Sequence, residues 1–264
     1  MIAASCIGRY GRLGNQMFQY ATAYSLSQNY DSKVAIGTKD SYSLSGKLQL
    51  SETFELPSAI INDFSGIKYR FQEKNFEFED ISKLSDYTDI VGYFQSEKYF
   101  ESHREKIVRE EFKFKKEILE KTDSIIETLK SDLQLCSLHV RRGDYLKLSD
   151  THPPLGIDYY EHALSFLPAE IEVIIFSDNI EEAKKLLESS KLIREQKKRY
   201  ISEYYAIEMC LMSRCNYHVI ANSSFSWWGA WLSESKRVIA PKFWFGSNGP
   251  KIWNDLYCKN WIVA

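Results

Sequence analysis

The chain has 264 residues, of which 44% are apolar and 27% are charged, and its formal net charge is -2. These values suit a globular protein of one large or two small domains, and they exclude a strongly basic surface that would attract nucleic acid nonspecifically. No run of about 18 apolar residues occurs and no secretory signal pattern opens the chain, so we expect no transmembrane helix and no secretion.

The five cysteines are odd in number and scattered, at positions 6, 136, 210, 215 and 258. Their spacing fits neither a metal site nor a set of disulfides. We therefore expect buried thiols in a reducing, cytoplasmic setting.

The first predicted elements are a strand and a helix that flank a glycine-rich turn. Residues 2–7 form an apolar run typical of a strand, and residues 17–28 have the apolar spacing of a helix. Between them, GRYGRLGNQ (8–16) places a glycine at every third position. This spacing is neither the G-x-G-x-x-G motif nor a Walker A loop.

The turn nevertheless has features that suit a ligand. Glycines such as Gly14 permit close approach of the backbone, and free N–H groups at a helix start favour an anion or sugar hydroxyls. Asn15 and Gln16 add side-chain donors and acceptors. The alternative is a tight structural turn, which the spacing alone slightly favours.

Residues 40–125 are polar, aromatic and rich in charge, as in EKNFEFED (73–80). We expect strands and helices of a smaller or irregular lobe here. No motif in this region indicates a ligand, and we expect it to govern the choice of acceptor. Residues 118–133 are expected to connect this lobe to the next one.

The second half alternates regularly between strand and helix patterns. This alternation predicts a parallel, doubly wound sheet with helices on both faces. The expected strands cover residues 133–140, 172–179, 199–203, 217–224 and 236–241, and the expected helices cover residues 157–167, 181–190, 204–214 and 225–235.

Three polar clusters, RRGD, SDN and NSS, follow predicted strands directly. Doubly wound sheets bind their ligands beyond the carboxyl ends of the strands. These clusters therefore mark the expected site.

The segment HVRRGDY (139–145) is the strongest candidate for an anion site. His139 and Arg141 should share one face of the strand, because successive side chains alternate between the two faces. Charged groups at the end of a buried strand need an anionic partner, and the planar fork of arginine suits phosphate oxygens.

The other members of this segment have several candidate roles. Arg142 should point to the opposite face and brace the site through a salt bridge, for which Asp144 is a candidate partner. Asp144 thus has three candidate roles, which are to cap the turn, to pair with an arginine or to act as a catalytic base. An interior arginine–aspartate pair is the structural alternative. The tripeptide RGD reads as accidental, since adhesion signals lie on exposed loop tips.

The remaining candidates lie after later strands or on a helix. Asp178 either caps the following helix or contacts a ligand hydroxyl. Glu208 lies among apolar residues, so it either accepts guanine N–H groups or belongs to a solvated helix face. The segment ANSSFSWWGAWL (221–232) joins a strand to a helix start with small hydroxyl residues, which is a natural diphosphate site. Its tryptophans are expected in the core.

Several chemistries lack their motifs in this sequence. No Asp-x-Asp, H-E-x-x-H, C-x-x-C or G-x-S-x-G occurs. An arginine-rich, metal-free diphosphate site is what remains.

Four segments together resemble the α-1,2-fucosyltransferases, glycosyltransferase family 11. They are GRLGNQMFQYA (11–21), HVRRGDY (139–145), FSDN (176–179) and ANSSFSWWGAWL (221–232), in the order of the family and across most of the chain. The resemblance implies an α/β, GT-B-like fold of two lobes. Residues 1–130 would form the acceptor side, and residues 131–264 a Rossmann-like lobe that binds GDP-fucose. It also implies inverting transfer to the 2-hydroxyl of a terminal galactose, with no metal and no other cofactor.

The resemblance also implies roles for single residues. Arg141 would contact the β-phosphate of the donor beside His139, and Glu208 would read guanine, although related enzymes have aspartate there. Asn15 would lie near the centre of sugar transfer. The rest of the expected GDP-fucose site comprises Arg142, Asp178, Asn222, Ser223, Ser224 and Phe225.

Two alternatives stay open at this point. One is a fucosyltransferase of another linkage, and the other is a nucleotide or carbohydrate binder without turnover. The expected partners are GDP-fucose and a galactose-terminated glycan, with no nucleic acid. Peripheral membrane association through a lipid-linked acceptor is compatible with this set.

Overall fold

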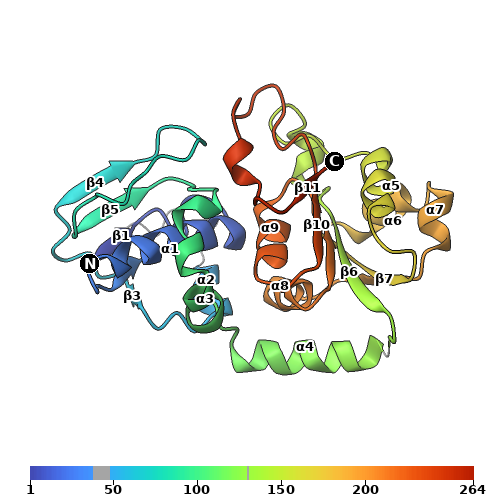
Figure 1. Cartoon of the computed structure of the whole chain (residues 1–264), viewed down its shortest axis with the longest axis horizontal. Coiled ribbons are helices and arrows are strands. Elements are labelled where there is room, and N and C mark those ends of the chain that lie inside the picture. The colour runs from blue at the N-terminus through green and yellow to red at the C-terminus, as the bar shows by residue number, and fades with distance from the viewer. Residues whose placement is uncertain (38–47, 130) are drawn as a thin grey trace. The chain divides into compact units, whose positions relative to one another are not determined.

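The structure is a computed structural model that describes residues 1–37, 48–129 and 131–264. The chain divides into two compact units. Unit 1 comprises Met1–Lys115 and Ile252–Cys258, and unit 2 comprises Lys116–Lys251 and Lys259–Ala264 (Figure 1). The predicted assignment of acceptor and donor to lobes 1–130 and 131–264 stays a prediction.

Unit 1 contains a five-stranded, fully parallel sheet in the order β3-β2-β1-β5-β4. Its strands are β1 (Ile2–Ala4), β2 (Val34–Ile36), β3 (Ala59–Ile61), β4 (Tyr69–Gln72) and β5 (Thr88–Val91). Its helices are α1 (Leu13–Gln28), α2 (Gln49–Thr53) and α3 (Arg104–Lys106), with a π-helical turn at Ile107–Glu111 and short 3-10 turns at Glu97–Tyr99, Glu101–His103 and Asn254–Leu256.

Residues 48–115 contribute regular structure to unit 1, as predicted, whereas residues 116–125 belong to helix α4 of unit 2 and residues 40–47 lie outside the described part of the chain. Helix α1 begins at Leu13, four residues before the predicted start at position 17. The side chain of Gln49 supplies the reason, because its Oε1 accepts a hydrogen bond from the Leu13 N–H at 2.6 Å. This distant partner satisfies a helix-start donor, which the local sequence could not reveal.

Unit 2 contains a six-stranded, fully parallel sheet in the order β11-β10-β9-β6-β7-β8. Its strands are β6 (Gln134–Val140), β7 (Ile171–Ser177), β8 (Lys198–Ile201), β9 (Tyr217–Val219), β10 (Arg237–Ala240) and β11 (Ile262–Val263). Its helices are α4 (Lys116–Leu129), α5 (Ile157–Ser165), α6 (Ile180–Leu187), α7 (Lys191–Glu195), α8 (Tyr205–Ser213) and α9 (Ser224–Trp231), with a 3-10 turn at Asp144–Lys147.

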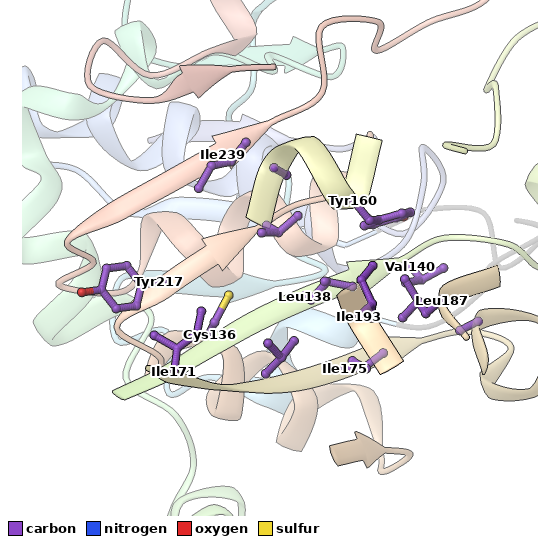
Figure 2. Packing of buried hydrophobic residues seen from close by; sticks show 14 residues of the cluster. Cys136, Leu138, Val140, Tyr160, Ile171, Ile175, Leu187, Ile193, Tyr217 and Ile239 are labelled. Carbon is purple, nitrogen blue, oxygen red and sulfur yellow. The ribbon is translucent and has the colours of Figure 1, made fainter. Parts of the chain in front are cut away.

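Helices cover both faces of the unit 2 sheet, with α5, α6 and α7 on one face and α8 and α9 on the other (Figure 1). The core on the first face is a buried aliphatic cluster around Leu138, Val140 and Ile175 (Figure 2). A second cluster, including Phe176 and Met212, fills the opposite face. Strands that are buried on both faces need continuous apolar runs, which explains why β7 is buried along its whole length.

The predicted elements of the second half all occur, so the doubly wound parallel sheet is confirmed. Helix α7 and strand β11 have too few residues to show a periodic pattern, and they were not predicted. Strand β9 ends at Val219, earlier than the predicted residue 224. The residues after it form the loop that leads to helix α9.

The strand order of the unit 2 sheet indicates at which strands a ligand site is expected. In unit 2 the connections run outward in one direction from β6 to β7 and β8, and in the other direction from β9 to β10 and β11. The sheet therefore reverses its order between β6 and β9. Ligands of doubly wound sheets bind outside the carboxyl ends of the strands at such a point. HVRRGDY (139–145) contains the last two residues of β6 and the turn after it, and NSS follows β9.

All five cysteines are free and buried, as predicted. In the described ranges, no helix combines the length and apolar character needed to cross a membrane.

Candidate functional site

The end of strand β6 separates neighbouring side chains onto the two faces of the sheet. Val140 belongs to the buried cluster under α5, α6 and α7. His139 points to the other face, where its ring centroid lies 6.0 Å from that of Phe225 in the first turn of α9. Arg141 is the first residue after β6. The predicted sharing of one face by His139 and Arg141 stays a prediction.

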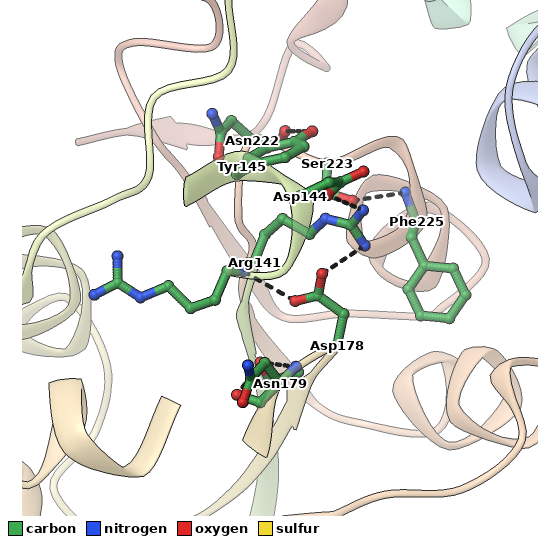
Figure 3. Close-up of polar contacts among 10 residues, drawn as sticks. Arg141, Asp144, Tyr145, Asp178, Asn179, Asn222, Ser223 and Phe225 are labelled. Atoms are coloured by element: carbon green, nitrogen blue, oxygen red, sulfur yellow. Dashed lines mark hydrogen bonds and ion pairs between the residues drawn. The ribbon is translucent and has the colours of Figure 1, made fainter. Parts of the chain in front are cut away.

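Arg141 is held by two carboxylates (Figure 3). Its Nη2 donates to Asp144 Oδ1 at 2.6 Å, and its Nη1 lies 3.2 Å from Asp178 Oδ2. The guanidinium carbon lies 5.1 Å from the centre of the Tyr145 ring. The Nε of Arg141 is buried and has no hydrogen-bond partner among the described residues. A buried donor without an acceptor costs free energy, so this position favours an incoming anion.

Asp178 connects two neighbouring residues of the arginine segment. Its Oδ1 accepts the backbone N–H of Arg142 at 2.9 Å while its Oδ2 faces Arg141. It does not cap helix α6, because Asn179 does so by accepting the Glu182 N–H at 3.2 Å. The helix-cap reading of Asp178 was therefore wrong by one residue.

Arg142 makes no ion pair within 4 Å in the part of the chain that the structure describes. The predicted salt-bridge brace from Arg142, with Asp144 as its candidate partner, is wrong, since Asp144 pairs with Arg141. Arg142 contributes its backbone N–H to the site instead. The turn at Gly143 brings Asp144 back toward Arg141, an effect that strand alternation cannot predict.

Gly143 has a steric role at this turn. A Cβ atom added at Gly143 would overlap the Asp178 carboxylate. We expect Gly143→Ala to displace Asp178 from Arg141 and Arg142, and to lower the free energy of unfolding by about 1–3 kcal/mol. Urea unfolding measures this change. Gly156→Ala is the matched control, because its added Cβ meets no atom within 4 Å. Equal stability of the two variants would contradict the steric role.

His139 is uncharged in the folded protein at neutral pH. Burial, and secondarily the charge of Arg141, lower its pKa from 6.5 to about 3. Its Nδ1 is buried without a hydrogen-bond partner in the described ranges. His139 therefore adds a neutral imidazole beside Arg141 and no second positive charge.

The loop after β9 presents the start of helix α9 to the same end of the sheet. Ser223 caps the helix by accepting the Phe225 N–H at 3.4 Å, and Ser224 begins it. The Nδ2 of Asn222 donates to the carbonyls of Pro153 and Trp244, at 3.0 and 3.1 Å. Asn222 thus ties two loops together, while the helix start supplies the N–H dipoles that attract anions.

Tyr145 belongs to this cluster, and its role was not predicted. Its ring lies under the Arg141 guanidinium, and its hydroxyl donates to the Asn222 carbonyl at 3.0 Å. Its ring also stacks on His152, with centroids 4.8 Å apart. Tyr145 therefore links the β6 and β9 loops under Arg141. An aromatic residue four positions after an arginine was a visible signal, although the sequence could not show the turn that joins them.

Glu208 lies on helix α8 and is half-buried, so the solvated-face reading is wrong. Burial is the main cause that raises its pKa from 4.5 to about 7, and the charges of Glu203 and Asp178 add to this effect. The Glu203 backbone N–H donates to its Oε1 at 3.1 Å and opposes the shift. Glu208 is thus a partly desolvated carboxyl within electrostatic range of Asp178.

The candidate residues near the N-terminus belong to unit 1 and lie in helix α1, not in a loop. Gln16 is fully buried, and its Oε1 accepts the Leu50 N–H at 3.2 Å, so its predicted place in a ligand loop is wrong. Gly14 is buried in the first turn. Asn15 is half-buried, and its Oδ1 accepts from Gln95 Nε2 at 2.8 Å.

Gly11 makes this geometry possible. It adopts a φ of +86°, and a Cβ there would overlap the Asn15 side chain. The turn therefore fixes Asn15 and Gln95 at the carboxyl ends of β1 and β5, where the strand order of the unit 1 sheet also reverses.

Comparison with known families shows the family to which the chain belongs. The model of the family described as Glycosyl transferase family 11 matches residues 4–264. The chain belongs to glycosyl transferase family 11. The resemblance seen in the four sequence motifs is thereby confirmed.

Relatives of this family 11 chain include two Escherichia coli proteins. It is 30% identical to the O-antigen biosynthesis glycosyltransferase WbnK, with 98% of this chain and 99% of that protein covered. It is 32% identical to an alpha-1,2-colitosyltransferase, with 89% and 90% covered. A galactoside alpha-(1,2)-fucosyltransferase 1 of Leontocebus fuscicollis is 25% identical, with 88% and 66% covered.

The fold of the family 11 chain is similar to that of solved fucosyltransferases. The crystal structure of NodZ alpha-1,6-fucosyltransferase soaked with GDP-fucose has a TM-score of 0.58 at 16% identity, with 95% of this chain and 97% of that chain covered. This likeness confirms the predicted GT-B-like fold class.

The family 11 structure brings most of the predicted donor residues to one end of the unit 2 sheet. His139 lies in β6 one residue before its end, and the others follow β6, β7 or β9: Arg141, Arg142, Asp144, Asp178, Asn222, Ser223, Ser224 and Phe225. No group of three or more histidine, cysteine, aspartate or glutamate side chains that could hold a metal occurs in the described ranges. The roles of these residues in donor binding stay predictions.

Proposed function

We propose that this family 11 glycosyltransferase transfers L-fucose from GDP-fucose to the 2-hydroxyl of a terminal galactose, with inversion and without a metal ion. The acceptor would be an oligosaccharide or a precursor of a surface polysaccharide. One observation carries the donor part of the proposal. Arg141 lies at the reversal point of the unit 2 sheet, with a buried Nε that has no partner among the described residues.

The chemistry of the transfer gives each group a task. The acceptor oxygen forms a bond to the anomeric carbon as the bond to the β-phosphate breaks, and GDP leaves with the electron pair. Arg141 and the N–H groups that start helix α9 would stabilise the negative charge that develops on the β-phosphate. The hydroxyl proton must pass to a base, and Asp144 is our candidate. Asn15 is proposed to act on the sugar side.

The α-1,2 linkage is supported by relatives whose names specify that linkage. A second donor deserves a direct test, because one 32% identical relative is a colitosyltransferase. Colitose is the 3-deoxy analogue of fucose. A site that hydrogen-bonds the 3-hydroxyl would reject GDP-colitose by a factor of about 10,000, whereas an apolar pocket would discriminate by only about 100.

The test of the function is an assay of GDP release with a panel of β-galactosides. We expect turnover with GDP-fucose and lactose in the presence of EDTA, and linkage analysis should find an α-1,2 product. The ratio of kcat/KM for GDP-fucose and GDP-colitose decides the donor. Binding of GDP without any turnover across the panel would favour a binding module. Loss of activity in EDTA, restored by a divalent ion, would contradict the metal-free proposal.

Glu208 gives the proposed guanine contact a measurable pH dependence. An ionised carboxylate can accept both the N1–H and N2–H of guanine, whereas a protonated one cannot. Since the pKa of Glu208 in the free protein is about 7, we expect the Kd for GDP to be about tenfold higher at pH 6 than at pH 8. Calorimetric titration of GDP measures this ratio.

Glu208→Gln is the control for this titration, because the GDP phosphate titrates equally with both proteins. The variant should bind GDP weakly at both pH values and lose its preference for GDP over ADP. An identical pH dependence in the variant and the wild type would contradict the guanine contact of Glu208.

The predicted cytoplasmic location and association with a lipid-linked acceptor stay predictions.

A further inference from the structure

The two carboxylates on Arg141 are not equivalent. Asp178 is anchored twice, by the Arg142 N–H at 2.9 Å and by Arg141 Nη1 at 3.2 Å. Its carboxylate also lies directly against the backbone of Gly143, because glycine has no side chain to separate them. Its side chain is 23% exposed. Movement of Asp178 away from Arg141 would therefore also break its hydrogen bond with the Arg142 N–H, which joins the loops after β6 and β7.

The Asp144 side chain makes one hydrogen bond among the described residues, to Arg141. Its Oδ1 accepts from Arg141 Nη2 at 2.6 Å, and its side chain is 44% exposed. It is the first residue of a short 3-10 turn, and no other hydrogen bond or ion pair of its side chain occurs within the described ranges. Since the Asp144 side chain is half-exposed and has no second anchor among the described residues, a change of its rotamer can release the pair into water.

A nucleoside diphosphate cannot simply be added to this arrangement. Two carboxylates already neutralise Arg141, and an anion beside both of them would meet like-charge repulsion. The guanidinium can gain a phosphate oxygen most readily if one carboxylate departs. The different anchoring of the two aspartates decides which one it is.

We propose that Asp144 is a placeholder for the donor diphosphate on Arg141, which the diphosphate displaces, while Asp178 is a permanent positioning residue for the Arg141 guanidinium. This inference rests on the proposed function, because it assumes a GDP-linked donor at Arg141. It adds an exchange of anions, in which Arg141 Nη2 passes from a carboxylate to a phosphate oxygen. The released Asp144 is then free of its cation when the acceptor proton has to be taken up.

The placeholder role predicts an unusual sign for a variant of a site residue. Asp144→Ala and Asp144→Asn should both tighten GDP binding, lowering the Kd about threefold, because the competing anion is gone. Asp178→Asn should raise the Kd about tenfold, since the amide can keep the Arg142 N–H but holds Arg141 less firmly. Calorimetric titration of the purified full chain with GDP measures all three.

Asp150→Asn is the matched control, because it removes one negative charge from the same exposed segment without touching Arg141. Its Kd for GDP should equal that of the wild type. Thermal unfolding should show that Asp144→Asn and Asp178→Asn fold like the wild type, so that the changes in Kd report on the site.

The outcomes separate this inference from the proposed function. If the wild type binds GDP and the Asp144 variants bind it equally or more weakly, the placeholder role alone is overturned. If Asp178→Asn tightens binding as the Asp144 variants do, the assigned difference between the two aspartates is overturned. A wild type that binds no GDP would overturn the proposed function and this inference together.

Discussion

Arg141→Ala is expected to lower kcat/KM for the donor by about 1,000-fold, because the charge that develops on the β-phosphate loses its principal cation. The expected loss is large since Arg141 is already oriented by Asp178 and by the Tyr145 ring before the donor arrives. A preoriented charge needs no reorganisation in the transition state. GDP release, measured over a range of donor concentrations, gives kcat and KM separately.

Two further variants sharpen this result. Arg141→Lys should recover little activity, because an ammonium group lacks the planar fork that can contact the Asp178 carboxylate and a phosphate at once. Arg194→Ala, on the exposed face of α7, should retain wild-type kcat/KM. Activity of Arg141→Ala within about tenfold of the wild type would place the diphosphate elsewhere.

Acidification is expected to destabilise unit 2 strongly through two buried histidines. His139 and His218 are both buried, and in each case burial is the main cause that lowers the pKa from 6.5 to about 3. The unfolded chain therefore binds two more protons than the folded chain between these pKa values. Stability that is present above pH 6.5 is lost as the pH falls, by up to about 1.4 kcal/mol per pH unit for each histidine.

Between pH 7 and pH 4.5 the two histidines together should lower the free energy of unfolding by about 5 kcal/mol. Urea unfolding followed by tryptophan fluorescence measures this change in unit 2. The signal is selective, since five of the six tryptophans, at positions 227, 228, 231, 244 and 261, belong to this unit.

His218→Gln tests the assignment to a particular residue. The ring Nδ1 of His218 lies 2.6 Å from Ser137 Oγ, and a glutamine amide offers a hydrogen-bonding group that does not titrate. The variant should be less stable than the wild type at pH 7 but should lose less stability on acidification. A variant with the same pH dependence as the wild type would show that His218 is not a source of the acid sensitivity.

The parts of the site that could be predicted are those in which the local sequence determines where a strand ends and to which face its side chains point. The apolar run of β6 ends directly before the charged Arg141, and alternation along a strand predicts that His139 and Arg141 share one face. The same argument placed polar residues after β7 and β9. Glu208 was found because a carboxylate among apolar helix residues is visible without knowledge of the fold.

The partners of these side chains were not predictable. Asp144 turned out to pair with Arg141 and not with Arg142, because the turn at Gly143 reverses the direction that strand alternation would give. Gln16 has the composition of a ligand residue, but it binds the backbone of α2, thirty-four residues away. Such pairings depend on which loops meet at the end of a sheet, which is a property of topology.

The sequence by itself determined the alternation of strands and helices in unit 2, the family and the arginine segment, since each depends on neighbouring residues. Only the tertiary structure decided that Asp178 holds Arg141, that Asp144 has one exposed contact, and that burial raises the pKa of Glu208 to about 7. These properties arise from residues of different elements meeting at the carboxyl ends of β6, β7 and β9 and at helix α8. Distances and burial between distant segments exist only once the chain has folded.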